Sequence, residues 1–163
     1  MNLFKRNGHD ESTTGDPATA KAINRLIELP RAEFEQLVAD LYCALGHNAR
    51  RTGGPGDRDF DIVIVAKSGQ HWIAQCKQWR GAVGESVVRE FYAAMAREHA
   101  VQGAIITTAR FTPKAVQWAQ GKPIHLYDGP AFLQVLQRIK GASAETGTGH
   151  GSNDRTDEHG SNF

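Results

Sequence analysis

Three side chains suited to metal-dependent phosphodiester chemistry lie in one short stretch of the sequence. Asp61 precedes a run of apolar and β-branched residues, and Gln75 and Lys77 stand two positions apart in a second such run. A Lys-Ser-Gly-Gln turn at 67–70 separates the runs, which predicts a β-hairpin. Because side chains alternate along a strand, we expect Gln75 and Lys77 on one face and Cys76 on the other.

These residue types match what phosphodiester hydrolysis requires. The reaction needs an activated water, neutralised charge on the phosphoryl oxygens and a stabilised leaving oxygen, and a divalent metal supplies most of this. Magnesium prefers hard oxygen ligands, which Asp61 and Gln75 both offer. Lys77 would lie beside the attacking water and offset developing negative charge. The alternative is that an Asp, a Gln and a Lys meet near a hairpin by chance.

Apolar spacing and turn residues predict helices that alternate with strands. Asp16-Pro17 has the pattern of a helix start, and Gly46 that of a helix end. The apolar periodicity predicts helices at about 17–28, 30–45, 85–100, 112–120 and 130–140, and strands at about 48–52, 58–66, 71–77, 103–108 and 123–127. This order predicts an α/β fold in which helices cover a sheet in three layers.

The composition divides the chain into three parts. With 163 residues and 40% hydrophobic content, the chain is long enough for one domain with a core. Residues 1–16 are polar and are expected to form a flexible lead, and residues 17–140 are expected to form the folded domain. From Gly141 onward the composition shifts to Gly, Ser, Thr, Asn, Asp and His, which predicts a disordered tail at 141–163.

Charge is spread unevenly along the sequence. The formal net charge is +1, but residues 30–140 carry fourteen Lys and Arg against ten Asp and Glu. This excess suits a polyanionic partner without requiring one. The two cysteines, Cys43 and Cys76, have no spacing typical of disulfides or zinc and are expected to be small buried residues.

Nothing in the sequence predicts a membrane association. The N-terminus lacks an apolar signal core, and the longest apolar stretch, 62–66, is too short to cross a bilayer. A cytoplasmic location is therefore the expectation.

Five segments together carry a family resemblance. They are Gly-Gly-Pro-Gly-Asp-Arg-Asp-Phe-Asp at 53–61, Gln-Cys-Lys-Gln-Trp at 75–79, Val-Val-Arg-Glu-Phe-Tyr at 87–92, Thr-Thr-Ala-Arg-Phe-Thr at 107–112 and Tyr-Asp-Gly at 127–129. From about residue 30 to 136 the chain resembles the Mrr-like restriction endonuclease branch of the PD-(D/E)xK nuclease superfamily. The resemblance implies a three-layer α-β-α, restriction-endonuclease-like fold with a central mixed sheet. It also implies Mg²⁺-dependent cleavage of double-stranded DNA, with Mn²⁺ as a substitute.

The resemblance assigns expected roles by position. Asp61 corresponds to the metal-binding acid, Lys77 to the catalytic lysine, and Gln75 to the second metal-site residue, where this branch commonly has Gln. The backbone carbonyl of Cys76 is expected as a further metal ligand. Glu35 matches the acid on the first long helix and is expected to hold a metal-bound water. An ordinary solvated glutamate is the alternative at that position.

The chain departs from the family pattern just before Asp61. The family usually has small residues where this chain has Arg58 and Asp59. In a regular strand Asp59 shares a face with Asp61, so it could add a metal ligand or crowd the site. This leaves the number of metal ions open. Asp57 is expected to cap the glycine loop.

Several basic and aromatic residues are candidates for contact with DNA, because Lys and Arg supply the sequence-independent part of DNA affinity. Arg80 and Arg89 are the first candidates, since they follow the reactive strand. The others are Arg50, Arg51, Trp79, Arg110 and Lys114. For each, an ordinary surface role is the alternative.

Three functions remain open at this point. The leading one is a magnesium-dependent endodeoxyribonuclease, in restriction or defence. A DNA-binding module that keeps the fold but does not cut is the second, and a repair-type or toxin-like nuclease on branched or modified DNA is the third. Cutting both strands needs two sites, so a homodimer or a separate specificity partner is expected.

Overall fold

The computed structural model describes residues 16–53 and 59–145. The expected flexible lead, most of the glycine loop with Asp57 and Arg58, and most of the expected tail lie outside these ranges. Among the described residues, no helix combines the length and apolar character needed to cross a bilayer.

The described residues form helices and strands close to the predicted positions. The helices are α1 (Pro17–Glu28), α2 (Arg31–Ala44), α3 (Glu85–Arg97), α4 (Pro113–Ala119) and α5 (Gly129–Glu145). The strands are β1 (Asn48–Arg51), β2 (Ile62–Val65), β3 (His71–Lys77), β4 (Gln102–Thr107) and β5 (Ile124–Tyr127).

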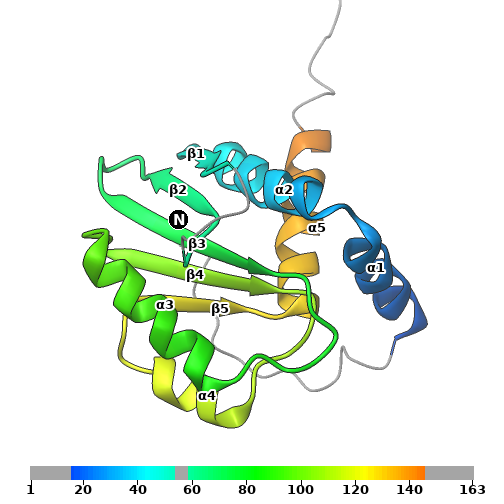
Figure 1. The fold of residues 1–163 in the computed structure, drawn as a ribbon. Helices are drawn as coiled ribbons and strands as arrows, with labels where there is room; N and C mark the ends of the chain where they lie inside the picture. Colours follow the sequence, from blue (N-terminus) through cyan, green and yellow to red (C-terminus); the bar gives the residue numbers. More distant parts are fainter. Residues whose placement is uncertain (1–15, 54–58, 146–163) are drawn as a thin grey trace, which may run out of the picture.

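The strands form one mixed sheet in the order β1-β2-β3-β4-β5 (Figure 1). β1 pairs antiparallel with β2, and β2 antiparallel with β3, whereas β3, β4 and β5 are parallel. The carboxyl ends of β1, β3, β4 and β5 and the amino end of β2 therefore lie along the same margin of the sheet, which we call the carboxyl edge. The predicted hairpin is confirmed as β2 and β3, which are joined by a turn with Gly69 at φ +83°.

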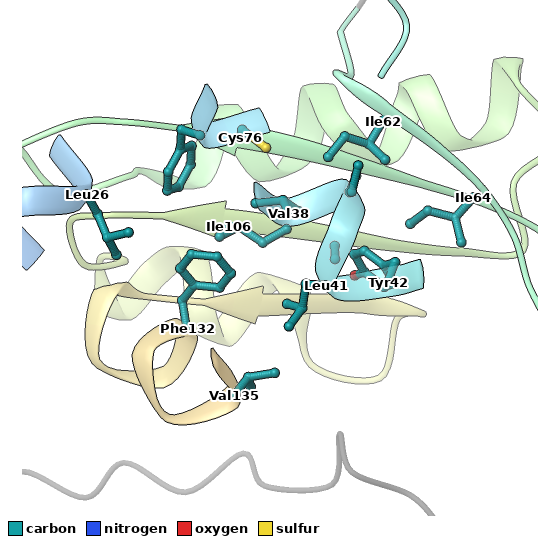
Figure 2. Packing of buried hydrophobic residues seen from close by; sticks show 14 residues of the cluster. Leu26, Val38, Leu41, Tyr42, Ile62, Ile64, Cys76, Ile106, Phe132 and Val135 are labelled. Carbon is teal, nitrogen blue, oxygen red and sulfur yellow. The ribbon is translucent and has the colours of Figure 1, made fainter. Parts of the chain in front are cut away.

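Helices cover both faces of the sheet, as the alternation predicted. α1, α2 and α5 lie on one face and α3 and α4 on the other (Figure 1). On the first face Phe34 of α2 meets Phe132 of α5 edge to face, with ring centroids 5.8 Å apart. Phe132 and Ile106 of β4 belong to the same core cluster (Figure 2). On the second face Phe91 and Met95 of α3 pack on the central strands. The sheet is thus buried on both sides.

The predicted helix starts have the expected local chemistry. The Asp16 carboxylate accepts a hydrogen bond from the Ala18 N–H at 3.3 Å before Pro17, and the Thr112 hydroxyl accepts one from the Ala115 N–H at 3.2 Å before Pro113. Such caps satisfy backbone donors that the first helical turn leaves unpaired.

Two expectations are wrong. Helix α5 runs to Glu145 instead of ending at Lys140, because Ala142 and Ala144 are strong helix formers that outweigh the glycine at 141. Cys43 lies exposed on α2, whereas Cys76 is buried as predicted.

Candidate active site

The carboxylate of Asp61 reaches the backbone of β3 between Gln75 and Lys77. Its Oδ2 accepts a hydrogen bond from the Cys76 N–H at 2.7 Å. Strand β2 is paired with β3 only as far as Ala74, so the Asp61 side chain takes the place of a strand partner for Cys76. The structure therefore brings Asp61 to the middle of the Gln-Cys-Lys segment.

A β-bulge directs Asp61 to this position. Ala74 is paired with Ile62, yet its carbonyl also accepts a hydrogen bond from the Asp61 N–H at 2.9 Å, so two residues of one strand oppose one of the other. The extra residue shifts the alternation of side chains upstream of β2. Phe60 consequently packs with the α3–α4 core, although a regular strand would place it on the same face as Ile62.

Asp59 does not share a face with Asp61, so that expectation is wrong. Beyond the bulge, the Asp59 carboxylate forms an ion pair with Arg97 at the end of α3, and both side chains are more than half exposed. Asp61 instead contacts α2 on the opposite face of the sheet. Within 16–53 and 59–145, no group of three or more His, Cys, Asp or Glu residues is arranged to hold a metal.

Cys76 contributes its backbone to the site and its side chain to the core. The thiol packs with α2 and α5, and burial, with the nearby Asp61 and Glu35 carboxylates, raises the pKa of the Cys76 thiol well above its ordinary value. The thiol is therefore neutral. The N–H and C=O of one strand residue point to the same neighbour, so the Cys76 carbonyl faces the side on which Asp61 lies.

Gln75 and Lys77 lie on the face opposite Cys76, as predicted, since Ile73 on the same side of β3 belongs to the α3–α4 core. The side-chain oxygen of Gln75, Oε1, is buried and has no hydrogen-bond partner among the residues that the structure describes. A buried oxygen without a partner is costly unless another group satisfies it. Amide, carboxylate and carbonyl oxygens are the ligand types that a hard divalent cation prefers, and Gln75, Asp61 and the Cys76 backbone offer one of each on adjoining segments.

Lys77 is fixed by its backbone and held by an aromatic ring. Its carbonyl accepts hydrogen bonds from the Thr107 hydroxyl at 2.8 Å and the Thr108 N–H at 3.2 Å. The Lys77 Nζ lies 4.9 Å from the centroid of the Trp79 ring, within range for a cation–π contact. Both threonines are buried at the end of β4, so this end of β4 fixes the position of the Lys77 backbone.

Glu35 is buried on α2 and paired with two arginines, so it is not an ordinary solvated residue. Its Oε1 accepts a hydrogen bond from Arg31 Nε at 2.7 Å, and its Oε2 accepts one from Arg51 Nε at 3.1 Å. Arg31 also donates from Nη2 to Asp61 Oδ1 at 2.9 Å. Arg31 thereby links the two acids of the site. Its pKa is raised above its ordinary value by the hydrogen bond to Glu35 first and that to Asp61 second.

Sequence reasoning missed Arg31. The only signal was its spacing of four residues from Glu35, which places both side chains on one helix face. The contact with Asp61 spans thirty positions and has no local signature.

Gln78 was not assigned a role from sequence, but it anchors the segment before Arg31. Its amide nitrogen donates to the carbonyls of Leu26 and Leu29, each at 2.8 Å. Leu26 lies in the last turn of α1 and Leu29 is its C-cap, where carbonyls have no partner within the helix. The residue that follows Lys77 thus holds the junction between α1 and α2.

The candidate DNA contacts lie along the carboxyl edge. Arg80 follows β3, and Arg110 and Lys114 follow β4, and all three are exposed. Arg51 ends β1 and is committed to Glu35, while Arg89 of α3 donates from Nε to Glu85 at 2.7 Å and lies over the Trp118 ring. Trp79 is 41% exposed beside Lys77. This arrangement gives the edge an excess of positive charge suited to a polyanion.

The two loops behind these residues are bonded to each other. The Val83 N–H donates to the Arg110 carbonyl at 2.7 Å, and the Thr112 N–H donates to the Val83 carbonyl at 2.9 Å. Backbone hydrogen bonds therefore hold the loop after β3, which carries Arg80, against the loop after β4, which carries Arg110.

Comparisons with known proteins agree with this architecture. Residues 26–136 match the family model Mrr_cat, described as a restriction endonuclease. The type IV methyl-directed restriction enzyme EcoKMrr of Escherichia coli (strain K12) is 31% identical over 129 residues, which are 74% of this chain. The chain spans 42% of the length of that relative.

Two solved structures share the fold at lower identity. The DNA modification-dependent restriction endonuclease AspBHI superposes with a TM-score of 0.62 at 17% identity, over 87% of this chain and 44% of its own. The MspJI restriction endonuclease, in complex with a 27-mer oligonucleotide, superposes with a TM-score of 0.56 at 19% identity, over 80% of this chain and 35% of its own. The predicted restriction-endonuclease-like fold is confirmed.

Proposed function

Because the chain belongs to the restriction endonuclease family whose Mrr catalytic-domain model it matches, we propose that it is a magnesium-dependent endodeoxyribonuclease that hydrolyses phosphodiester bonds of double-stranded DNA. One observation carries the proposal beyond family membership. The Asp61 carboxylate bonds to the backbone between Gln75 and Lys77, so an acid, an amide oxygen and an ammonium belong to one segment of the carboxyl edge.

We propose the metal ligands from this donor set. Asp61, the Gln75 side-chain oxygen and the Cys76 carbonyl would hold a divalent ion, and the partnerless Gln75 Oε1 supports this assignment. When bound, such an ion supplies charge neutralisation on the phosphoryl oxygens and lowers the pKa of a water. Mn²⁺ suits the same oxygen ligands.

The protein side chains would position the reacting groups. The Lys77 ammonium orients the attacking water, whose oxygen forms the new bond to phosphorus as the bond to the leaving oxygen breaks. Glu35 holds a second water through its carboxylate. Arg80, Arg110 and Lys114 contact phosphates along the duplex, with Arg51, Arg89 and Trp79 as further contacts.

The direct test is cleavage of supercoiled plasmid by the purified protein with Mg²⁺ or Mn²⁺. We expect nicked and linear products from the wild-type protein and none from Lys77→Ala, with matching circular dichroism spectra for both. Lys140→Ala, an exposed lysine on α5 that is not among the proposed DNA contacts, is the matched control and should still cut. An intact plasmid under all conditions, with a folded protein, would contradict the proposal.

The choice of DNA needs separate substrates. The names of two similar proteins refer to methylated or modified DNA, but the chain spans less than half of each. Methylated, unmethylated and branched DNA should therefore be tested in parallel. Since cutting both strands needs two sites, we also propose a homodimer on DNA, which light scattering of the complex would detect.

A second candidate function is a DNA-binding module that does not cut. It is favoured by the arginines that already occupy Glu35 and Asp61. Calorimetric titration with Mg²⁺ separates the two functions, because a non-cutting module would bind DNA with a steep salt dependence and take up no metal.

A further inference from the structure

All four oxygens of the two carboxylates already accept hydrogen bonds from within the protein. Glu35 Oε1 and Asp61 Oδ1 are bonded to Arg31, at 2.7 and 2.9 Å. Glu35 Oε2 is bonded to Arg51 and Asp61 Oδ2 to the Cys76 N–H. Two negative and two positive side chains thus form a set that is neutral overall. A divalent cation that joins this set meets two guanidinium charges instead of two uncompensated acids.

Arg31 is the most exposed member of this set. Its side chain is 72% exposed, whereas those of Glu35 and Asp61 are 10% and 11% exposed and that of Arg51 is 30% exposed. Water can therefore solvate the Arg31 guanidinium when it leaves, at little cost. The main chain of Arg31 stays in place, because Gln78 holds the Leu29 carbonyl and the Pro30 carbonyl starts α2.

Asp61 Oδ1 is the oxygen for which Arg31 and a metal ion would compete. The other oxygen of this carboxylate, Oδ2, accepts a hydrogen bond from the buried Cys76 N–H, which β2 does not pair. Losing that bond would leave a buried donor unsatisfied, at a larger cost than losing the bond to exposed Arg31. A metal that uses Asp61 therefore gains access through Oδ1, where Arg31 Nη2 now lies at 2.9 Å.

We propose that Arg31 is a resident counter-ion of Asp61 and Glu35 that a divalent cation must displace from Asp61 Oδ1, so that Arg31 sets the metal concentration the protein requires. This inference rests on the proposed function, because it takes Asp61 as a metal ligand. Arg31 is a positioning residue in this scheme and not a catalytic one.

The test is calorimetric titration of Mn²⁺ into the full chain in the absence of DNA. Arg31→Gln removes the competing charge and should bind Mn²⁺ about three- to tenfold more tightly than the wild-type protein, given a partly solvated pair of like charges. Arg31→Lys keeps the charge and should stay close to the wild-type affinity. Arg97→Gln is the matched control, since Arg97 is also an exposed arginine paired with an aspartate, and should leave the affinity unchanged.

The outcomes separate this inference from the proposed function. Tighter binding by Arg31→Gln alone supports it, and so does uptake that appears only in that variant. Equal or weaker binding by a folded Arg31→Gln overturns it, while the proposed function stands if Asp61→Asn abolishes the wild-type uptake. If no variant takes up metal, or if uptake is independent of Asp61, both are overturned. Thermal melting of each variant confirms that the fold is retained.

Discussion

Asp61 and Glu35, the acid pair of the candidate site, differ from Gln75 and Lys77, its strand pair on β3. The difference lies in how fully the protein satisfies their polar atoms. Asp61 and Glu35 have a donor on every oxygen. Gln75 has a buried oxygen without a partner among the described residues, and the Lys77 ammonium has a ring beneath it. The described residues therefore satisfy every oxygen of the acid pair, whereas none of them satisfies the Gln75 oxygen of the strand pair. Substitutions on the two sides should accordingly have different signatures.

The largest effect is expected from the acid pair. Asp61→Asn should slow plasmid cleavage at least about a thousandfold and abolish Mn²⁺ uptake, because a metal ligand and a charge are lost together. Its melting temperature should change little, since asparagine can still accept from the Cys76 N–H. Cleavage rates with saturating Mg²⁺ measure the effect. A variant that cuts within about tenfold of wild type would show that Asp61 serves only the fold.

Gln75→Met should raise the stability of the protein and lower its cleavage activity. Methionine fills similar space without a buried carbonyl, so the free energy of unfolding should rise by about 1 kcal/mol and the melting temperature by about 2–4 °C. Cleavage should fall about a hundredfold. Calorimetry and cleavage rates test both parts.

Gln75→Glu is the companion variant, because it restores an acidic oxygen at the same position. It should retain cleavage. Lower stability of Gln75→Met would mean that the oxygen has a partner after all, and the contrast between the two pairs would disappear.

Glu35→Gln should have a moderate effect. It keeps an acceptor for one arginine but loses the charge, so single-turnover cleavage should slow about tenfold. Glu33→Gln, in the same helical turn but exposed, is the matched control and should be unaffected. Equal rates for the two variants would mean that Glu35 only pairs with Arg31 and Arg51 in the fold and has no part in cleavage.

The smallest effect is expected at Asp59. Its pair with Arg97 is exposed on both sides, at 52% and 59%, and such pairs contribute at most about 1 kcal/mol. Asp59→Asn should leave Mn²⁺ affinity within about twofold of wild type by calorimetric titration. A loss of tenfold or more would place Asp59 among the metal ligands in spite of its contact with α3.

Local patterns in the sequence predicted most of the fold. The hairpin, the helix starts at Asp16 and Thr112 and the faces of Gln75 and Lys77 follow from turn chemistry and periodicity, which act over a few residues. The bulge at Asp61 could not be predicted in this way, because it depends on how a second strand pairs. Because the extra residue of the bulge was not recognised, Asp59 was predicted on the wrong face of the sheet.

The contacts around the acids were also beyond prediction. Arg31 meets Asp61 through the packing of α2 against the sheet, and Gln78 meets Leu26 and Leu29 across about fifty positions. Such contacts are set by tertiary structure and leave no periodic trace. The sequence therefore indicated candidate site residues but not the residues that contact them.

The bond between Gln78 and the end of α1 has a practical consequence for truncation. The family match begins at residue 26, in the last turn of α1, and a chain shortened to that limit would lose most of this helix. The Leu26 and Leu29 carbonyls would remain in the sequence, but the helix that presents them to Gln78 would be too short to form. Expression boundaries for this domain should therefore begin before Asp16, so that the helix and its capping carboxylate are both kept.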